Sequence, residues 1–183
     1  NQYSAELTSG QLVMAITFLL VFGLASFLMG VLIGKIDPSL TKPIQIAQRP
    51  IVEDNECYEN GMAGIGTRQY ASPIIRNNRC YKNKLAGIGS RTHATPVIIG
   101  NDCFENGLSG IGQESEAVTL LIDNHCHQNM AAGIGFATCK TGRSTVINNR
   151  VIDNAAVAIG INSGWVVHLS ANELSRKEGL PPV

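Results

Sequence analysis

Hydrophobic and polar positions recur at a fixed interval along most of the chain. The octapeptide "ENGMAGIG" at residues 59–66 returns as "KNKLAGIG" at 82–89, "ENGLSGIG" at 105–112 and "QNMAAGIG" at 128–135, a step of 23 residues. A repeat of 20–50 residues is typical of solenoid proteins, whose units bury a hydrophobic face only by stacking on one another. The sequence therefore predicts a stacked array in this part of the chain.

The pattern inside each repeat predicts strands and not helices. The recurring "IxxNxCxxN" gives short extended pieces separated by corners, and it leaves no stretch of 10–15 residues for an amphipathic helix. Three apolar columns align at the same position of successive repeats: Val52, Ile75, Ile98, Leu121, Val146 and Leu169; Cys57, Cys80, Cys103, Cys126, Val151 and Leu174; and Ile65, Ile88, Ile111, Ile134 and Ile159. If the repeats stack about 4.8 Å apart, the residues of each column form a continuous ladder inside a parallel β-coil.

Two columns of asparagine accompany the apolar ladders. They are Asn55, Asn78, Asn101, Asn124, Asn149 and Asn172, and Asn60, Asn83, Asn106, Asn129 and Asn154. We expect these residues to adopt left-handed backbone at the corners and to bond amide to amide between coils, which satisfies buried polar groups. The glycines that flank the isoleucine column are expected to permit tight bends.

The repeat motifs carry a resemblance to a known superfamily. "NNRCYKNKLAGIG" and its copies resemble the right-handed parallel β-helix of the pectate-lyase-like superfamily, which includes sugar-hydrolase and NosD-type β-helices. The resemblance covers residues 50–174 and implies an all-β, right-handed β-helix of five to six coils. A two-residue insertion near "CKTGRS" precedes the fifth coil, and the sixth is partial. We expect the β-helix domain, residues 50–183, to continue beyond Val183, or each of its ends to be covered by a partner chain. The superfamily holds lyases, hydrolases, epimerases, adhesins and structural domains, so the resemblance implies no single activity.

An apolar segment precedes the repeats. Residues 12–34 carry no charge and would span about 34 Å as a helix, enough to cross a bilayer core. The sequence predicts a transmembrane anchor over residues 1–36 and a proline-containing linker over 37–49. Ser26, Gly30 and Gly34 share one helix face at four-residue spacing, a pattern that favours packing against a second membrane helix.

The orientation of this anchor has two opposing indications. Lys35, Lys42 and Arg49 follow the span, which by the positive-inside rule favours a cytoplasmic β-helix domain. The resemblance implies an extracytoplasmic domain instead. We expect a single-pass membrane protein with its β-helix outside the cytoplasm, and leave the side open.

Composition excludes some classes of function. Lys+Arg and Asp+Glu both number 14, so the net charge is zero and no basic patch is available for nucleic acid. The column cysteines are interpreted as apolar core residues, because parallel stacked side chains have poor geometry for disulfides. Cys139, in the inserted loop, is the thiol expected to be accessible.

Outward positions supply the candidate chemistry. Glu56, Arg79, Asp102, His125 and Arg150 form one column, which predicts a ladder of neutralising charges. Asp102, Arg79 and His125 are also the one trio that resembles a polysaccharide lyase or hydrolase site, and they are the candidate catalytic residues.

A ring column and a histidine pair complete the candidates. The ring column is Tyr58, Tyr81, Phe104 and His127. It is a candidate binding surface for sugar or for a protein partner, with a purely structural ring ladder as the alternative. His125 and His127 form an H-x-H pair that could hold a metal ion, but no third ligand is evident at a suitable spacing. The sequence therefore predicts no metal and no cofactor.

Two functions remain. The first is a membrane-anchored scaffold or interaction module that contacts other membrane-protein subunits through its helix and its β-helix faces or ends. The alternative is a surface-tethered polysaccharide-binding or polysaccharide-active protein. A groove lined by Asp102, Arg79 and His125 would favour the enzyme.

Overall fold

The structure is a computed structural model that describes residues 48–176. The predicted membrane segment, most of the linker and the helix-packing residues Ser26, Gly30 and Gly34 lie outside the described residues. Within residues 48–176, no helix is long and apolar enough to cross a membrane.

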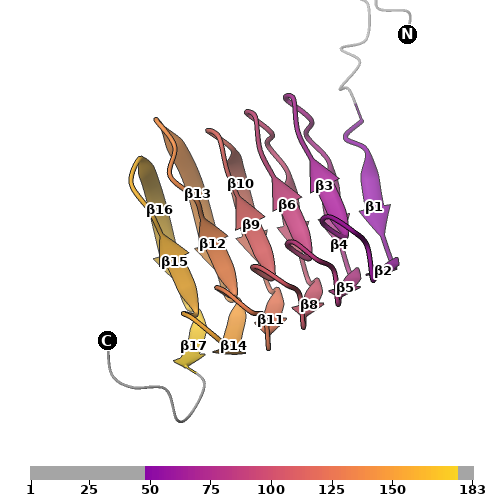
Figure 1. Cartoon of the computed structure of the whole chain (residues 1–183). Coiled ribbons are helices and arrows are strands. Elements are labelled where there is room, and N and C mark those ends of the chain that lie inside the picture. Colours follow the sequence, from indigo (N-terminus) through magenta and orange to yellow (C-terminus); the bar gives the residue numbers. More distant parts are fainter. Residues whose placement is uncertain (1–47, 177–183) are drawn as a thin grey trace, which may run out of the picture. The chain divides into compact units, whose positions relative to one another are not determined.

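Within the described residues, seventeen short strands form three parallel sheets (Figure 1). Sheet A contains β1 (Ile51–Glu53), β4 (Ile74–Arg76), β7 (Val97–Ile99), β10 (Val118–Ile122), β13 (Gly142–Ile147) and β16 (Trp165–Ser170). Sheet B contains β2 (Glu56–Tyr58), β5 (Arg79–Tyr81), β8 (Asp102–Phe104), β11 (His125–His127), β14 (Arg150–Asn154) and β17 (Glu173–Arg176). Sheet C contains β3 (Ile65–Thr67), β6 (Ile88–Ser90), β9 (Ile111–Gln113), β12 (Ile134–Phe136) and β15 (Ile159–Ile161). Each coil takes one strand from each sheet, giving five coils and a partial sixth, as the repeat predicts.

The pairing register follows the repeat. Ile75 pairs with Ile98 at the 23-residue step, and Leu121 pairs with Val146 at a step of 25, which accommodates the predicted insertion. The frame then returns to 23 between Val146 and Leu169. Because a slip of one residue would turn every side chain to the opposite face, this register fixes the inward columns.

The core consists of the predicted apolar ladders. In the middle coils the aliphatic columns are fully buried, as are the thiols of Cys80, Cys103 and Cys126. All the cysteines are free thiols. The hydrogen bond between the Cys80 and Cys103 thiols, together with burial, holds the pKa of Cys80 far above its ordinary value, so this thiol is protonated and inert.

The asparagine ladders are also confirmed. Asn101 Nδ2 donates to Ile75 O at 3.0 Å and to Asn124 Oδ1 at 2.9 Å, while its Oδ1 accepts the backbone N–H of Asn78 at 2.9 Å. Buried asparagines of the middle coils therefore bond to the coils on both sides, which satisfies their amides at the corners, whereas the partners of Asn154 in other coils all lie in the preceding coil.

The prediction that the asparagines adopt left-handed backbone is wrong by one position. Positive φ angles occur at the residues directly before the two asparagine columns: Asp54, Asn77, Gly100, Asp123, Asn148 and Ala171, and Glu59, Lys82, Glu105, Gln128 and Asp153. The preceding residue turns the chain, so that the asparagine side chain points inward to the ladder.

The expectation that the glycines beside the isoleucine column supply tight bends is also wrong. Gly87 has no positive φ; a Cβ placed there would lie 2.8 Å from Gly110 O and 2.9 Å from Asn106 Nδ2. The first glycine of each "GIG" therefore allows close approach between coils and does not supply a bend.

Candidate functional site

Sheet B carries the predicted charge ladder. Arg79 Nη1 lies 2.7 Å from Glu56 Oε1 and its Nε lies 3.9 Å from Asp102 Oδ2, and Arg150 Nε lies 3.0 Å from Glu173 Oε2. These side chains are about half exposed, so each pair contributes at most about 1 kcal/mol to stability. The ladder balances charge along the coil.

Two histidines converge on one carboxylate within this ladder. Asp102 Oδ1 lies 3.3 Å from His125 Nδ1 and 3.2 Å from His127 Nε2, and the two imidazole rings are 4.2 Å apart between centroids. The structure thus brings together the predicted trio of Arg79, Asp102 and His125 and adds His127, which the sequence placed in the ring column. Sequence reasoning missed this contact because Asp102 and His127 belong to different columns and meet diagonally across adjacent coils.

The environment of His125 favours its neutral form. Partial burial is the largest cause that lowers its pKa, and the neighbouring His127 adds to it, outweighing the attraction of Asp102. Arg150 Nη1 lies 3.1 Å from Nε2, where it can donate to the unprotonated ring nitrogen.

The ring column is a continuous stack. Centroids are 5.2 Å apart between Tyr58 and Tyr81, 4.9 Å between Tyr81 and Phe104, and 5.0 Å between Phe104 and His127, with interplanar angles of 7–11°. The Arg79 guanidinium lies 5.5 Å from the Phe104 ring centroid. The rings present their faces to one another and their edges outward. Because sugars stack on ring faces, this arrangement favours the structural ladder, and the binding role of the column stays a prediction.

A groove runs along the outer face of sheet C, on the side opposite to the buried isoleucines of its strands. The central residue of every strand in this sheet is glycine: Gly66, Gly89, Gly112, Gly135 and Gly160. These positions project no side chain, so backbone forms the floor. The groove has a volume of about 570 Å³ and extends from the first coil to the fifth.

The two borders of the groove differ in character. The turns that precede the strands contribute exposed apolar side chains, among them Met62, Leu85 and Leu108. The residues that follow the strands include Arg68, Arg91 and Glu114. The groove therefore offers a long apolar edge facing a polar one. Sequence reasoning missed it because the second glycine of "GIG" was interpreted as a bend.

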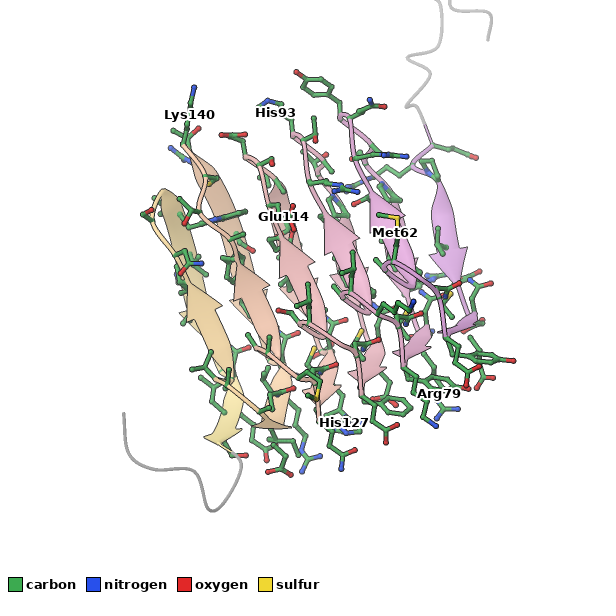
Figure 2. All side chains as sticks on the ribbon, in the orientation of Figure 1. Met62, Arg79, His93, Glu114, His127 and Lys140 are labelled. Atoms are coloured by element: carbon green, nitrogen blue, oxygen red, sulfur yellow. The ribbon has the colours of Figure 1, made fainter. Side chains whose placement is uncertain are left out.

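The groove and the acid–base residues occupy different sheets. None of Arg79, Asp102, His125 and the ring column lines the groove. In Figure 2, Met62 and Glu114 lie on the face toward the viewer, whereas Arg79 and His127 project from the lower edge. Within residues 48–176, the groove on sheet C is therefore not the groove expected of an enzyme, which the trio would line.

One buried amide beside the groove has no partner. Gln113 is 1% exposed, and neither its Oε1 nor its Nε2 has a hydrogen-bond partner among the described residues; the same holds for Ser90 Oγ in the preceding coil. Such groups lower stability when no water satisfies them.

These features define the class of the protein. It is a parallel β-solenoid with asparagine ladders, a core of thiols and aliphatic side chains, and an open groove on one sheet. The chain belongs to the right-handed beta helix region family, whose model matches residues 44–174. No curated protein matches the chain.

Solved structures share this fold at low sequence identity. The periplasmic alginate epimerase AlgG matches at a TM-score of 0.53 and 15% identity, covering 67% of this chain and 39% of that one. A single-substitution mutant of the same enzyme gives a TM-score of 0.55 at 15% identity, with coverage of 67% and 39%. A double mutant gives 0.53 at 15% identity, with 69% and 40%. The chain thus spans about two fifths of the length of these structures, and the likeness concerns the fold.

Proposed function

We propose that this protein is a binding module of a membrane-associated assembly and not an enzyme. Residues 12–34 anchor it in the membrane, and the β-helix domain, on the extracytoplasmic side, binds another subunit through the groove on sheet C. The proposal rests most directly on one observation, the separation of the groove from Asp102, Arg79 and His125.

This separation matters because acid–base catalysis requires the catalytic groups to lie within hydrogen-bond reach of the reacting atoms. A polymer held in the groove lies against backbone and apolar side chains, while the trio is engaged in the charge ladder of sheet B.

The dimensions of the groove suit an extended polypeptide. Four steps of about 4.8 Å between the first and fifth coils give about 19 Å, the length of roughly six residues of extended chain. Leu108 is 48% exposed and Met62 is 58% exposed along the apolar edge. Exposed apolar side chains aligned along a depression mark a protein contact surface more often than a solvated one.

A second candidate ligand is an acidic polysaccharide. Arg68 and Arg91 lie on the same border of the groove, one coil apart, where their guanidinium groups could contact carboxylates spaced along a sugar chain. The fold likeness to a periplasmic alginate epimerase is consistent with such a ligand.

A matched pair of variants tests the proposal. Leu108→Asp places a carboxylate on the apolar edge of the groove, and Val118→Asp places one on sheet A at a side chain of equal exposure, 48%. The full-length chain is purified from its native membranes in mild detergent, and partners that co-purify in stoichiometric amount are identified. A glycan array with the same proteins tests the second candidate.

We expect a protein subunit to accompany the wild type and Val118→Asp and to be lost from Leu108→Asp. Binding to acidic glycans without a protein partner, abolished by Arg91→Ala, would replace the first candidate with the second. Retention of the partner by Leu108→Asp would contradict the assignment to the groove.

A further inference from the structure

We propose that Asp102, His125 and His127 form a binding site for a divalent transition-metal ion of the zinc class. One carboxylate oxygen and two imidazole nitrogens from these residues all lie within 4.8 Å of one another. Among residues 48–176, this is the one group of metal-ligating side chains that lie so close together. The site is separate from the groove, and the proposal does not depend on the proposed function.

The two distances from the carboxylate oxygen to the imidazole nitrogens match those of a tetrahedral site. Zinc–nitrogen bonds of about 2.0–2.1 Å at tetrahedral angles place adjacent ligand atoms about 3.3 Å apart. Asp102 Oδ1 lies 3.3 Å from His125 Nδ1 and 3.2 Å from His127 Nε2. An ion can therefore enter with small rotations of the side chains, leaving its fourth position to water.

The strands hold these donors in place. His125 and His127 lie on the same face of β11 because Cys126, between them, points into the core. Asp102 is the direct register partner of His125 on β8. Since Cys126 and its partner Cys103 are fully buried, the backbone that carries the three ligands is fixed.

Imidazole and carboxylate are ligands that zinc, copper and nickel accept, whereas magnesium and calcium prefer oxygen ligands alone. The equivalent positions of the neighbouring coils carry Arg79 with Tyr81 and Arg150 with Ile152. The donor set therefore occurs where the third and fourth coils meet.

Two arginines oppose a cation at this position and limit its affinity. Arg79 Nε lies 3.9 Å from Asp102 Oδ2, and Arg150 Nη1 lies 3.1 Å from His125 Nε2. Both side chains have other partners, Glu56 for Arg79 and Glu173 for Arg150, to which they can remain bound while metal occupies the site. We therefore expect a dissociation constant in the micromolar range.

In the test, the full-length protein is titrated with zinc chloride, and isothermal titration calorimetry measures the binding. Cobalt(II) in place of zinc reports the geometry, because tetrahedral cobalt absorbs visible light strongly. A Cys139→Ser background removes the partly exposed thiol of the inserted loop; the other partly exposed thiol, Cys57, lies in the first coil, away from the coils that carry the site. The decisive variant is His127→Phe, which removes one ligand and continues the ring stack of Phe104, so that the coil is preserved. His93→Ala, an exposed histidine outside the cluster, is the matched control.

We expect one zinc per chain, at least tenfold weaker binding in His127→Phe and in Asp102→Asn, and unchanged binding in His93→Ala. Absence of binding to the wild type, or a folded His127→Phe variant that binds zinc as tightly as the wild type, would overturn the proposal.

Discussion

Replacing Asn106 with alanine removes the middle of an asparagine ladder. The Asn106 side chain is fully buried, and its Nδ2 donates to Cys80 O and to Asn129 Oδ1, both at 2.9 Å. Its Oδ1 accepts from the backbone N–H and from the side-chain amide of Asn83, at 3.2 and 3.0 Å. The substitution therefore removes four hydrogen bonds at once.

The magnitude follows from the groups that lose their partners. The backbone N–H of Asn83 is left unpaired in the interior, at about 1–3 kcal/mol, whereas the carbonyl of Cys80 keeps the ladder bond that the parallel register with β8 gives it. Asn129 Oδ1 keeps one donor, the backbone N–H of residue 106. With the loss of the remaining side-chain hydrogen bonds added, we expect the free energy of unfolding to fall by about 2–4 kcal/mol.

Asn60→Ala is the matched control, because Asn60 is the exposed first member of the same ladder. Its amide donates to Asn83 Oδ1 at 2.8 Å, and that oxygen also accepts the backbone N–H of residue 60, which survives the change. We expect a loss below about 1 kcal/mol. Urea unfolding followed by circular dichroism measures both variants. Equal losses, or a loss under about 1 kcal/mol for Asn106→Ala, would refute the claim that the ladder satisfies buried backbone groups.

Four further predictions concern the coils and their thiols. Gly87→Ala should lower the free energy of unfolding by about 1–3 kcal/mol, because its Cβ would meet Gly110 O at 2.8 Å, whereas Gly89→Ala in the same coil meets only Ala63 Cβ at 3.7 Å and should change little in the same urea assay. Gln113→Leu should raise the melting temperature, since it removes a buried amide without a partner and gains about 1 kcal/mol; a lower melting temperature would indicate that water satisfies this amide. Iodoacetamide should label Cys139 in the folded protein and the fully buried column thiols only after unfolding, as peptide mass spectrometry can check. The raised pKa of Cys80 and Cys103 also predicts that stability is retained below the ordinary thiol value of 9.0 and falls as pH rises above it, because only the unfolded chain then loses the protons; urea midpoints that stay constant across this range would contradict it.

The repeat made the fold predictable because alignment at a 23-residue step also supplies the register. Once Ile75, Ile98 and Leu121 are placed in one column, their burial and the opposite direction of their neighbours follow from the period of a strand. The same reasoning gave the inward cysteines and the charge ladder. It did not identify which corner residue is left-handed, since that depends on the inward direction of the asparagine side chain.

The candidate site was less predictable because it depends on contacts between residues of different columns in the repeat alignment. Asp102 meets His127 diagonally, between positions that the alignment keeps apart. The groove exists because Gly89 and its equivalents have no side chain. The sequence predicts bends at these glycines, but in the structure they form the floor of the groove between Leu85 and Arg91. A comparison of equivalent positions does not show the diagonal contact, and it shows the glycine column without the direction that the column faces.

The groove is the central claim, and a photo-crosslinking amino acid tests it most directly. Introduced at Leu108 on the groove edge, it should capture a polypeptide when the full-length protein is irradiated in its native membranes. The same group at Val118 on sheet A should capture none. Crosslinks from position 118, or from position 79 on sheet B, without any from position 108, would contradict the account.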